Sequence, residues 1–271
     1  MTGREVRCKS ILNKSKIPGV DYALNPYIGC EHNCQYCYAS FMKKFTNHPE
    51  PWGKFVDIKV NAPEMLQSHI KRLRQKSRIS LGTVCDVYQP VEEKYQLTRR
   101  CLEILKYYHH HISILTKSPL ILRDLDILKR IKDIEVGFTI TTLDEKIKNF
   151  FEPNSPAPEE RLKALKIIAN EKIPTWVFVA PLLPYLTDKP QSLIELIRGA
   201  ARAGAMNITF DTLNPYPNVW HNVTEIVKKY FPQLIEDYNN YFINKTLYEK
   251  TIKEKISEIG KNFNVVIDFA F

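Results

Sequence analysis

The chain of 271 residues is 44% apolar, carries a formal net charge of +9 and contains six cysteines. No apolar run approaches the length of a membrane span, so we expect a cytoplasmic protein with no membrane partner. This length and composition allow one substantial core, and a single α/β barrel of this size is ordinary. The positive charge is spread along the chain, so it fits general solubility as well as a nucleic-acid partner.

Strands and helices are predicted to alternate along the middle of the chain, with a repeat of about thirty residues that matches one strand–helix unit. This alternation predicts parallel strands, and short parallel strands with outer helices close into a barrel or part of one. The first strand is predicted to end near Tyr27 and Ile28, directly before a cysteine-rich loop. Later strands are expected at 79–81, 112–115, 134–138, 175–179 and 206–210, and helices at 97–107, 120–131, 158–170 and 192–203.

The last part of the chain, 214–271, is predicted to be a C-terminal helical extension packed on a core barrel formed by 1–213. Between 246 and 259, Ile252 and Ile256 lie among alternating charges, which indicates an amphipathic helix. The segment 265–269 is predicted to be an extra strand that covers an edge of the sheet.

The cysteine-rich loop places Cys30, Cys34 and Cys37 within eight residues, with no fourth cysteine nearby. A four-iron cluster needs one ligand on each iron, so three cysteines leave one iron open for another ligand. Structural zinc is the alternative, with His32 as a fourth ligand, although no second metal-binding pair follows. A disulfide scaffold is not expected, because the chain shows no signal peptide and has few cysteines for its length.

The C-x3-C-x2-C spacing, with Tyr36 directly before the last cysteine, resembles the cluster loop of radical S-adenosylmethionine (SAM) enzymes. The run from Asn25 to Ala39 resembles more specifically the branch related to spore photoproduct lyase. This resemblance extends from about Lys9 to about Leu213. Its further matches are Asp86, Tyr88-Gln89-Pro90, Thr116-Lys117-Ser118, Arg123-Asp124, Thr141-Thr142-Leu143-Asp144, Glu152-Pro153 and Arg161.

The resemblance implies an α/β fold of the partial (β/α)6 TIM-type barrel class, with parallel strands. It also implies a [4Fe-4S] cluster held by Cys30, Cys34 and Cys37, with SAM chelated at the open iron. An electron donor such as ferredoxin or flavodoxin would then drive cleavage of SAM to a 5′-deoxyadenosyl radical, which abstracts hydrogen from a substrate.

Polar residues are predicted to follow five strands, and parallel barrels place their working groups at these strand ends. Lys117, directly after an apolar strand, is suited to the carboxylate of SAM, and Asp86 is suited to its ammonium group. The hydroxyls of Thr139 or Thr141 are candidates to fix the amino acid or the ribose. The whole set comprises the cysteine loop, 83–86, Thr116 with Lys117, Thr139 with Thr141 and Thr142, and Asp211 with Asn214.

The resemblance also implies roles for two residues outside these pairs. Tyr36 is expected to face the adenine of SAM. Arg161, paired with Glu152, is expected to support the SAM-binding loops, although a salt bridge at a helix start explains it nearly as well.

The lyase family carries a hydrogen-donating cysteine where this chain has Thr83, whose hydroxyl is a poor hydrogen-atom donor. We therefore group Thr83 with the cofactor-binding residues. Cys85 lies two residues later and faces the same side if the loop stays extended, so it is our candidate hydrogen donor. Tyr38, next to Cys37, is a candidate to relay a radical to Cys85.

Three function classes remain open from the sequence. The first is a radical SAM enzyme of the photoproduct-lyase-like group that acts on DNA or RNA. The second is the same chemistry on a peptide or a small metabolite. The third is a non-catalytic, metal-stabilised protein that binds nucleic acid.

Overall fold

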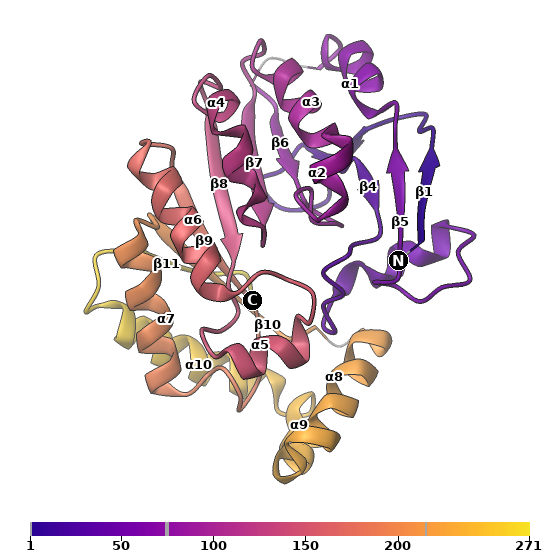
Figure 1. The fold of residues 1–271 in the computed structure, drawn as a ribbon. Helices are drawn as coiled ribbons and strands as arrows, with labels where there is room; N and C mark the ends of the chain where they lie inside the picture. Colours follow the sequence, from indigo (N-terminus) through magenta and orange to yellow (C-terminus); the bar gives the residue numbers. More distant parts are fainter. Residues whose placement is uncertain (1, 74–75, 215) are drawn as a thin grey trace.

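The computed structural model describes residues 2–73, 76–214 and 216–271, and its centre is a largely parallel sheet (Figure 1). Within these residues the sheet has eight strands in the order β11-β10-β9-β8-β7-β6-β3-β2. Every neighbouring pair from β3 to β11 is parallel, and β2 pairs antiparallel with β3. The strands are β2 Leu12–Lys14, β3 Tyr22–Leu24, β6 Arg78–Leu81, β7 His111–Thr116, β8 Ile134–Thr139, β9 Thr175–Leu182, β10 Asn207–Thr212 and β11 Val266–Phe269.

Helices lie between successive parallel strands and cover the outside of the sheet, as Figure 1 shows. This confirms the predicted partial barrel of strand–helix units. The connections contain α2 Val91–Tyr95 and α3 Leu97–Leu105, η2 Pro119–Asp124 and α4 Leu125–Leu128, α5 Glu145–Phe151 and α6 Pro158–Asn170, and α7 Pro190–Ala203.

The prediction for the first barrel strand was wrong. The strand that enters the barrel is β3, which ends at Leu24, whereas Tyr27–Ile28 forms the short β4 of a second sheet. Pro26 separates the two strands because it has no amide hydrogen to give to a ladder. The second sheet has the order β1-β5-β4, with β1 Thr2–Val6 and β5 Phe55–Lys59, and it was not anticipated from the sequence.

The helix predicted at 120–131 is instead a 3-10 turn, η2, followed by the short α4. Ser118 caps this turn by accepting a hydrogen bond from the amide of Leu120 at 3.2 Å. Apolar periodicity does not separate a 3-10 turn from an α-helix over so few residues. The other predicted helices are present, and α6 begins and ends where the sequence placed it.

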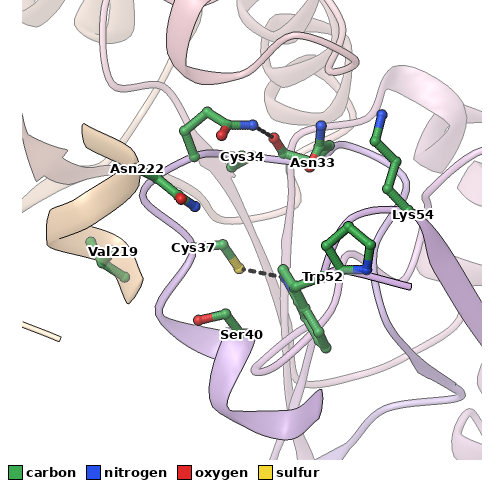
Figure 2. A pocket seen from close by; sticks show the side chains of 10 residues that line it. Asn33, Cys34, Cys37, Ser40, Trp52, Lys54, Val219 and Asn222 are labelled. Atoms are coloured by element: carbon green, nitrogen blue, oxygen red, sulfur yellow. Dashed lines mark hydrogen bonds between the residues drawn. The ribbon is translucent and has the colours of Figure 1, made fainter. Parts of the chain in front are cut away.

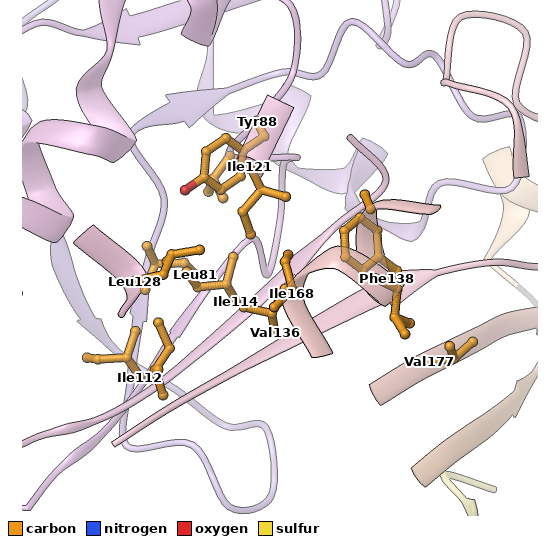
Figure 3. Close-up of a cluster of buried hydrophobic side chains, with 14 of the residues drawn as sticks. Leu81, Tyr88, Ile112, Ile114, Ile121, Leu128, Val136, Phe138, Ile168 and Val177 are labelled. Carbon is orange, nitrogen blue, oxygen red and sulfur yellow. The ribbon is translucent and has the colours of Figure 1, made fainter. Parts of the chain in front are cut away.

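The main hydrophobic core lies between the strands and their covering helices (Figure 3). On β7, Ile112 and Ile114 are fully buried and Ser113 between them is half-buried. These side chains belong to one cluster with Leu128 of α4 and Ile168 of α6. Because apolar positions fill the strands, polar groups gather where the strands end.

The C-terminal part contains α8 Pro217–Tyr230, η3 Pro232–Leu234, α9 Ile235–Tyr241 and α10 Lys245–Gly260. The predicted amphipathic helix and edge strand are both present, as α10 and β11. β11 adds to the barrel sheet beside β10, so this part of the chain contributes to the sheet as well as packing on it. No helix in the described residues has the length and apolar character needed to cross a membrane.

Two further helical segments lie near the second sheet. η1 Tyr38–Phe45 follows the cysteine loop directly, and α1 Ala62–Ile70 follows β5. A basic run at 71–78 begins directly after the end of α1. Residues 74 and 75 of this run lie outside the described part of the chain.

Candidate active site

The cysteine loop runs from β4 to η1 and is held tightly against β5. Gly29 has φ of +92°, and a Cβ on it would overlap the carbonyl oxygen of Phe55. Only glycine has this conformational freedom without a side chain in the way. The loop therefore starts at a fixed point, and Cys30 directly after Gly29 is buried.

Cys30 is buried in the loop, and Cys34 and Cys37 are half-buried. Burial and then the charge of Asp86 raise the pKa of Cys30 well above its ordinary value. Burial raises the pKa of Cys34 to about 12, although the Lys117 ammonium opposes this. Burial also raises the pKa of Cys37, although the Trp52 indole N–H, 3.3 Å from its sulfur, opposes this. Without a bound cation these groups are thiols, and iron supplies the positive charge that lets thiolates form.

This donor set fits an iron–sulfur cluster. Three soft sulfur ligands on one loop suit separate irons of a cluster, with an iron left open. Within the described residues, no group of three or more His, Cys, Asp or Glu side chains is placed around a single metal ion. His32, the alternative zinc ligand, instead places its Nε2 3.1 Å from Asp86 Oδ2.

Asp86 follows β6 and ties the cysteine loop to the end of β7. Its Oδ1 accepts hydrogen bonds from the Thr116 hydroxyl at 2.6 Å and from the Tyr88 amide at 2.9 Å. Its Oδ2 accepts one from the Lys117 amide at 2.7 Å and lies next to His32. Burial opposes ionisation, but His32 and these donors outweigh it and hold the pKa of Asp86 well below its ordinary value.

Lys117 follows β7 and turns its ammonium group toward the cysteine loop. Its Nζ lies 5.8 Å from the centre of the Tyr36 ring. Burial opposes the charge, but Cys34 and Glu152 raise the pKa of Lys117 above its ordinary value. No hydrogen-bond acceptor contacts this Nζ among the described residues, so it is a cation available to an anionic ligand.

Glu152, at the end of α5, is completely buried between Tyr36 and Arg161. The Tyr36 hydroxyl and the Thr141 hydroxyl donate to its Oε1, the latter at 2.8 Å. Burial disfavours the carboxylate, but Arg161 and then Lys117 hold the pKa of Glu152 well below its ordinary value. The expected Glu152–Arg161 pair is therefore present, and it fixes the aromatic residue of the cysteine loop.

Arg161 lies on α6 and reaches back to the end of β8. Its NH1 donates to the carbonyl oxygen of Thr139 at 2.9 Å, and its Nε donates to that of Pro156 at 3.1 Å. Thr139 and Thr141 are both buried at this strand end. Arg161 thus joins the start of α6 to the end of β8, where the predicted cofactor-binding residues Thr139 and Thr141 lie.

A second group of polar side chains surrounds Asn25, for which the sequence predicted no role. Its side-chain amide donates to Thr83 Oγ1 at 2.8 Å, and its Oδ1 lies 3.7 Å from Cys85 Sγ. The Tyr38 hydroxyl donates to the carbonyl oxygen of Thr83. The loop after β6 bends rather than staying extended, yet Thr83 and Cys85 still meet at one side chain.

Sequence reasoning missed several residues that position the site. Gln89 donates to the carbonyl oxygen of Gly29 at 3.2 Å and accepts from the Glu31 amide at 2.9 Å, so it fastens the cysteine loop. Gln89 could have been identified from the sequence, because it lies in the Tyr88-Gln89-Pro90 string that matches the lyase-related branch. For Trp52, isolated in a polar loop, the sequence offered no signal.

These features define a class: a parallel α/β partial barrel whose three-cysteine loop faces polar groups at the strand ends. The description "Radical SAM superfamily" is matched by residues 24–197, and the chain belongs to this family. Membership implies a [4Fe-4S] cluster and SAM as cofactors, and the predicted family is confirmed.

Two kinds of known protein resemble the chain. An uncharacterized protein of Methanocaldococcus jannaschii is 35% identical over 95% of this chain and 93% of its own length. A spore photoproduct lyase mutant has a similar fold, with a TM-score of 0.74 at 17% identity, covering 99% of this chain and 82% of that one. Spore photoproduct lyase complexed with dinucleoside spore photoproduct gives a TM-score of 0.71 at 16% identity, covering 99% and 82%.

Proposed function

We propose that this protein uses a [4Fe-4S] cluster and SAM to start a radical reaction on a nucleic-acid substrate. When bound, the two cofactors supply a 5′-deoxyadenosyl radical able to abstract hydrogen from carbon. The observation that carries the proposal is the convergence of Asp86, Lys117 and Glu152 on the one loop that holds the three cysteines.

Cys30, Cys34 and Cys37 would ligate three irons, and Lys117 would pair with the SAM carboxylate. Asp86 was expected to bind the SAM ammonium group directly. Because four protein groups already surround its carboxylate, we now propose that it fixes His32 and Lys117 instead.

Tyr36 and Arg161 would act through Glu152. The Tyr36 hydroxyl donates to Glu152, which orients the ring beneath Lys117. The donors of Arg161 point to protein acceptors, so it would hold the end of β8 in place. Thr139 and Thr141, at that strand end, would shape the wall around the amino acid or the ribose of SAM.

Cys85 would return a hydrogen atom to the product radical. Burial raises the pKa of Cys85 to about 12, which keeps the S–H bond intact at neutral pH. Breaking that S–H bond forms a product C–H bond and leaves a thiyl radical. The thiyl takes a hydrogen atom from the Tyr38 hydroxyl, and the tyrosyl radical takes an electron from a ferredoxin or flavodoxin and a proton from water.

Two observations support a nucleic-acid substrate. The net charge is +9, which favours binding to phosphates. A structural neighbour is spore photoproduct lyase in complex with dinucleoside spore photoproduct. Thr83 differs from the residue expected in that lyase family, so the reaction on the substrate is proposed to use Cys85 in its place.

The test uses anaerobically reconstituted protein with SAM, dithionite and UV-irradiated oligonucleotide, with chromatographic analysis of the products. We expect 5′-deoxyadenosine from the wild type and a repaired or altered oligonucleotide. The Cys85→Ala variant should still form 5′-deoxyadenosine while product formation drops about tenfold or more. Cys101→Ala, at a fully buried thiol on α3, is the control. Protein that binds iron but never forms 5′-deoxyadenosine would contradict the proposal.

A further inference from the structure

Trp52 lies in the 51–54 turn and contacts the cysteine loop, and the proposed function assigns it no role. Figure 2 shows its indole N–H directed at Cys37 Sγ, and the distance between them is 3.3 Å. Both side chains line a cavity of about 240 Å³ between the cysteine loop, the 51–54 turn and the start of α8. Cys37 therefore faces a space that solvent can reach.

The 51–54 turn is built to hold Trp52 in this position. The Lys54 amide donates to the carbonyl oxygen of Pro51 at 3.1 Å, which closes the turn. Gly53 has φ of +88° and packs so closely on Asn33 of the cysteine loop that a Cβ would overlap its side chain. The Trp52 ring also meets Phe55 edge-on, with centroids 5.9 Å apart. The indole is thus fixed from two sides.

The hydrogen bond distinguishes one cluster cysteine from the other two. Within the described part of the chain, Trp52 is the one side chain that donates a hydrogen bond to Cys30, Cys34 or Cys37 sulfur. Hydrogen bonds to ligand sulfurs are one of the ways in which a protein sets the potential of an iron–sulfur cluster. An N–H dipole aimed at sulfur favours the reduced cluster, which carries one more negative charge.

We propose that Trp52 is a positioning residue that raises the reduction potential of the cluster through its N–H bond to the Cys37 sulfur. This inference rests on the proposed function, because it needs a cluster at these cysteines. Trp52 makes the cluster easier to reduce by an external one-electron donor.

The test is a redox titration with dithionite under argon, followed by electron paramagnetic resonance of the reduced cluster. Trp52→Phe keeps an aromatic ring but removes the donor. We expect its midpoint potential to fall by an amount that corresponds to a tenfold loss in the reduction equilibrium, about 59 mV for one electron. Trp176→Phe is the control, because the Trp176 indole N–H is buried without an acceptor among the described residues. Its potential should equal that of the wild type.

A second variant separates the hydrogen bond from packing. β-(3-Benzothienyl)alanine at position 52 keeps the bicyclic shape and has sulfur where tryptophan has N–H. If Trp52→Phe fails to hold a cluster, this variant tests whether the N–H bond to the Cys37 sulfur sets the reduction potential. A fall in potential with this residue supports the inference, and an unchanged potential overturns it.

The outcomes also separate this inference from the proposed function. Wild-type protein that holds no redox-active cluster contradicts both. A wild type that forms 5′-deoxyadenosine, with variants of unchanged potential, overturns only the role of Trp52. An equal fall in Trp176→Phe would likewise overturn it, since that change does not touch the cysteine loop.

Discussion

Arg161 heads the large side chains that are completely buried among the described residues. Its charge is compensated by one ion-pair partner. Glu152 supplies the opposite charge, and Ser155 and two carbonyl oxygens satisfy further donors. A buried ion pair of this kind adds little net stability compared with an apolar pair, but loss of one partner leaves a charge without compensation. The pair therefore holds geometry at the site more than it stabilises the chain.

Arg161→Met is expected to lower the free energy of unfolding by about 3–5 kcal/mol, because the buried Glu152 loses the countercharge to which it is hydrogen-bonded. The measurement is urea unfolding of the cluster-free protein. Adding Glu152→Gln should recover part of the loss. Lys163→Met is the matched control on the same helix, since the Lys163–Glu159 pair is exposed and should contribute less than about 1 kcal/mol. Equal losses in the two single variants would contradict this interpretation of the buried pair.

At the scale of elements, the cysteine loop is positioned by β5, a strand that the sequence analysis did not predict. Gly29 meets the backbone of Phe55 at the start of this strand, and Trp52 lies in the turn just before it. Asp57 of the same strand forms a salt bridge with Arg4 of β1, with Arg4 Nε 2.9 Å from Asp57 Oδ1. The small second sheet thus supports the cysteine loop.

Gly29→Ala is expected to destabilise the protein more than the same change at Gly19. Both residues have positive φ, which costs alanine about 1–2 kcal/mol. A Cβ at Gly19 meets open space, whereas one at Gly29 would overlap the Phe55 carbonyl oxygen and add about 1–3 kcal/mol of overpacking. Thermal unfolding of both variants measures the difference. Similar losses would show that the cysteine loop is not pressed against β5.

Most of the barrel strands could be predicted because each combines an apolar run with a following helix. The helix at 158–170 was predictable to the residue, since Pro158 and two acidic residues mark its start. The short strands β1, β4 and β5 were missed or misplaced. They are too short to give a clear periodic signal, and their pairing joins distant segments: Thr2 pairs with Phe55, and Tyr27 pairs with Ile58.

For the molecule as a whole, the C-terminal part cannot be separated from the barrel core. Ile252 and Ile256 of α10 lie in the same buried cluster as the barrel strands, and β11 extends the sheet beyond β10. A second cluster joins Tyr36 of the cysteine loop to Val223 of α8 and Tyr238 of α9. The proposed division at 213/214 therefore marks a change in architecture, and we predict that the two parts unfold as one cooperative unit.

A chain that ends at Leu213 is expected to aggregate or to lack a cooperative unfolding transition. It would expose the edge of β10 and the apolar surface that α10 covers. Size-exclusion chromatography and thermal unfolding test this, with the full chain beside it. A soluble, monomeric fragment with a sharp transition would show instead that 1–213 folds on its own.

The sequence by itself determined the three-cysteine motif, because the spacing of Cys30, Cys34 and Cys37 is local and survives in any fold that keeps the loop. It also determined the alternation of strands and helices from β6 to β10, since apolar periodicity is a property of neighbouring residues. Only the tertiary structure decided that Asn25 joins Thr83 to Cys85 and that Trp52 reaches Cys37. These contacts depend on how separate segments pack, and no short-range pattern in the chain encodes that packing.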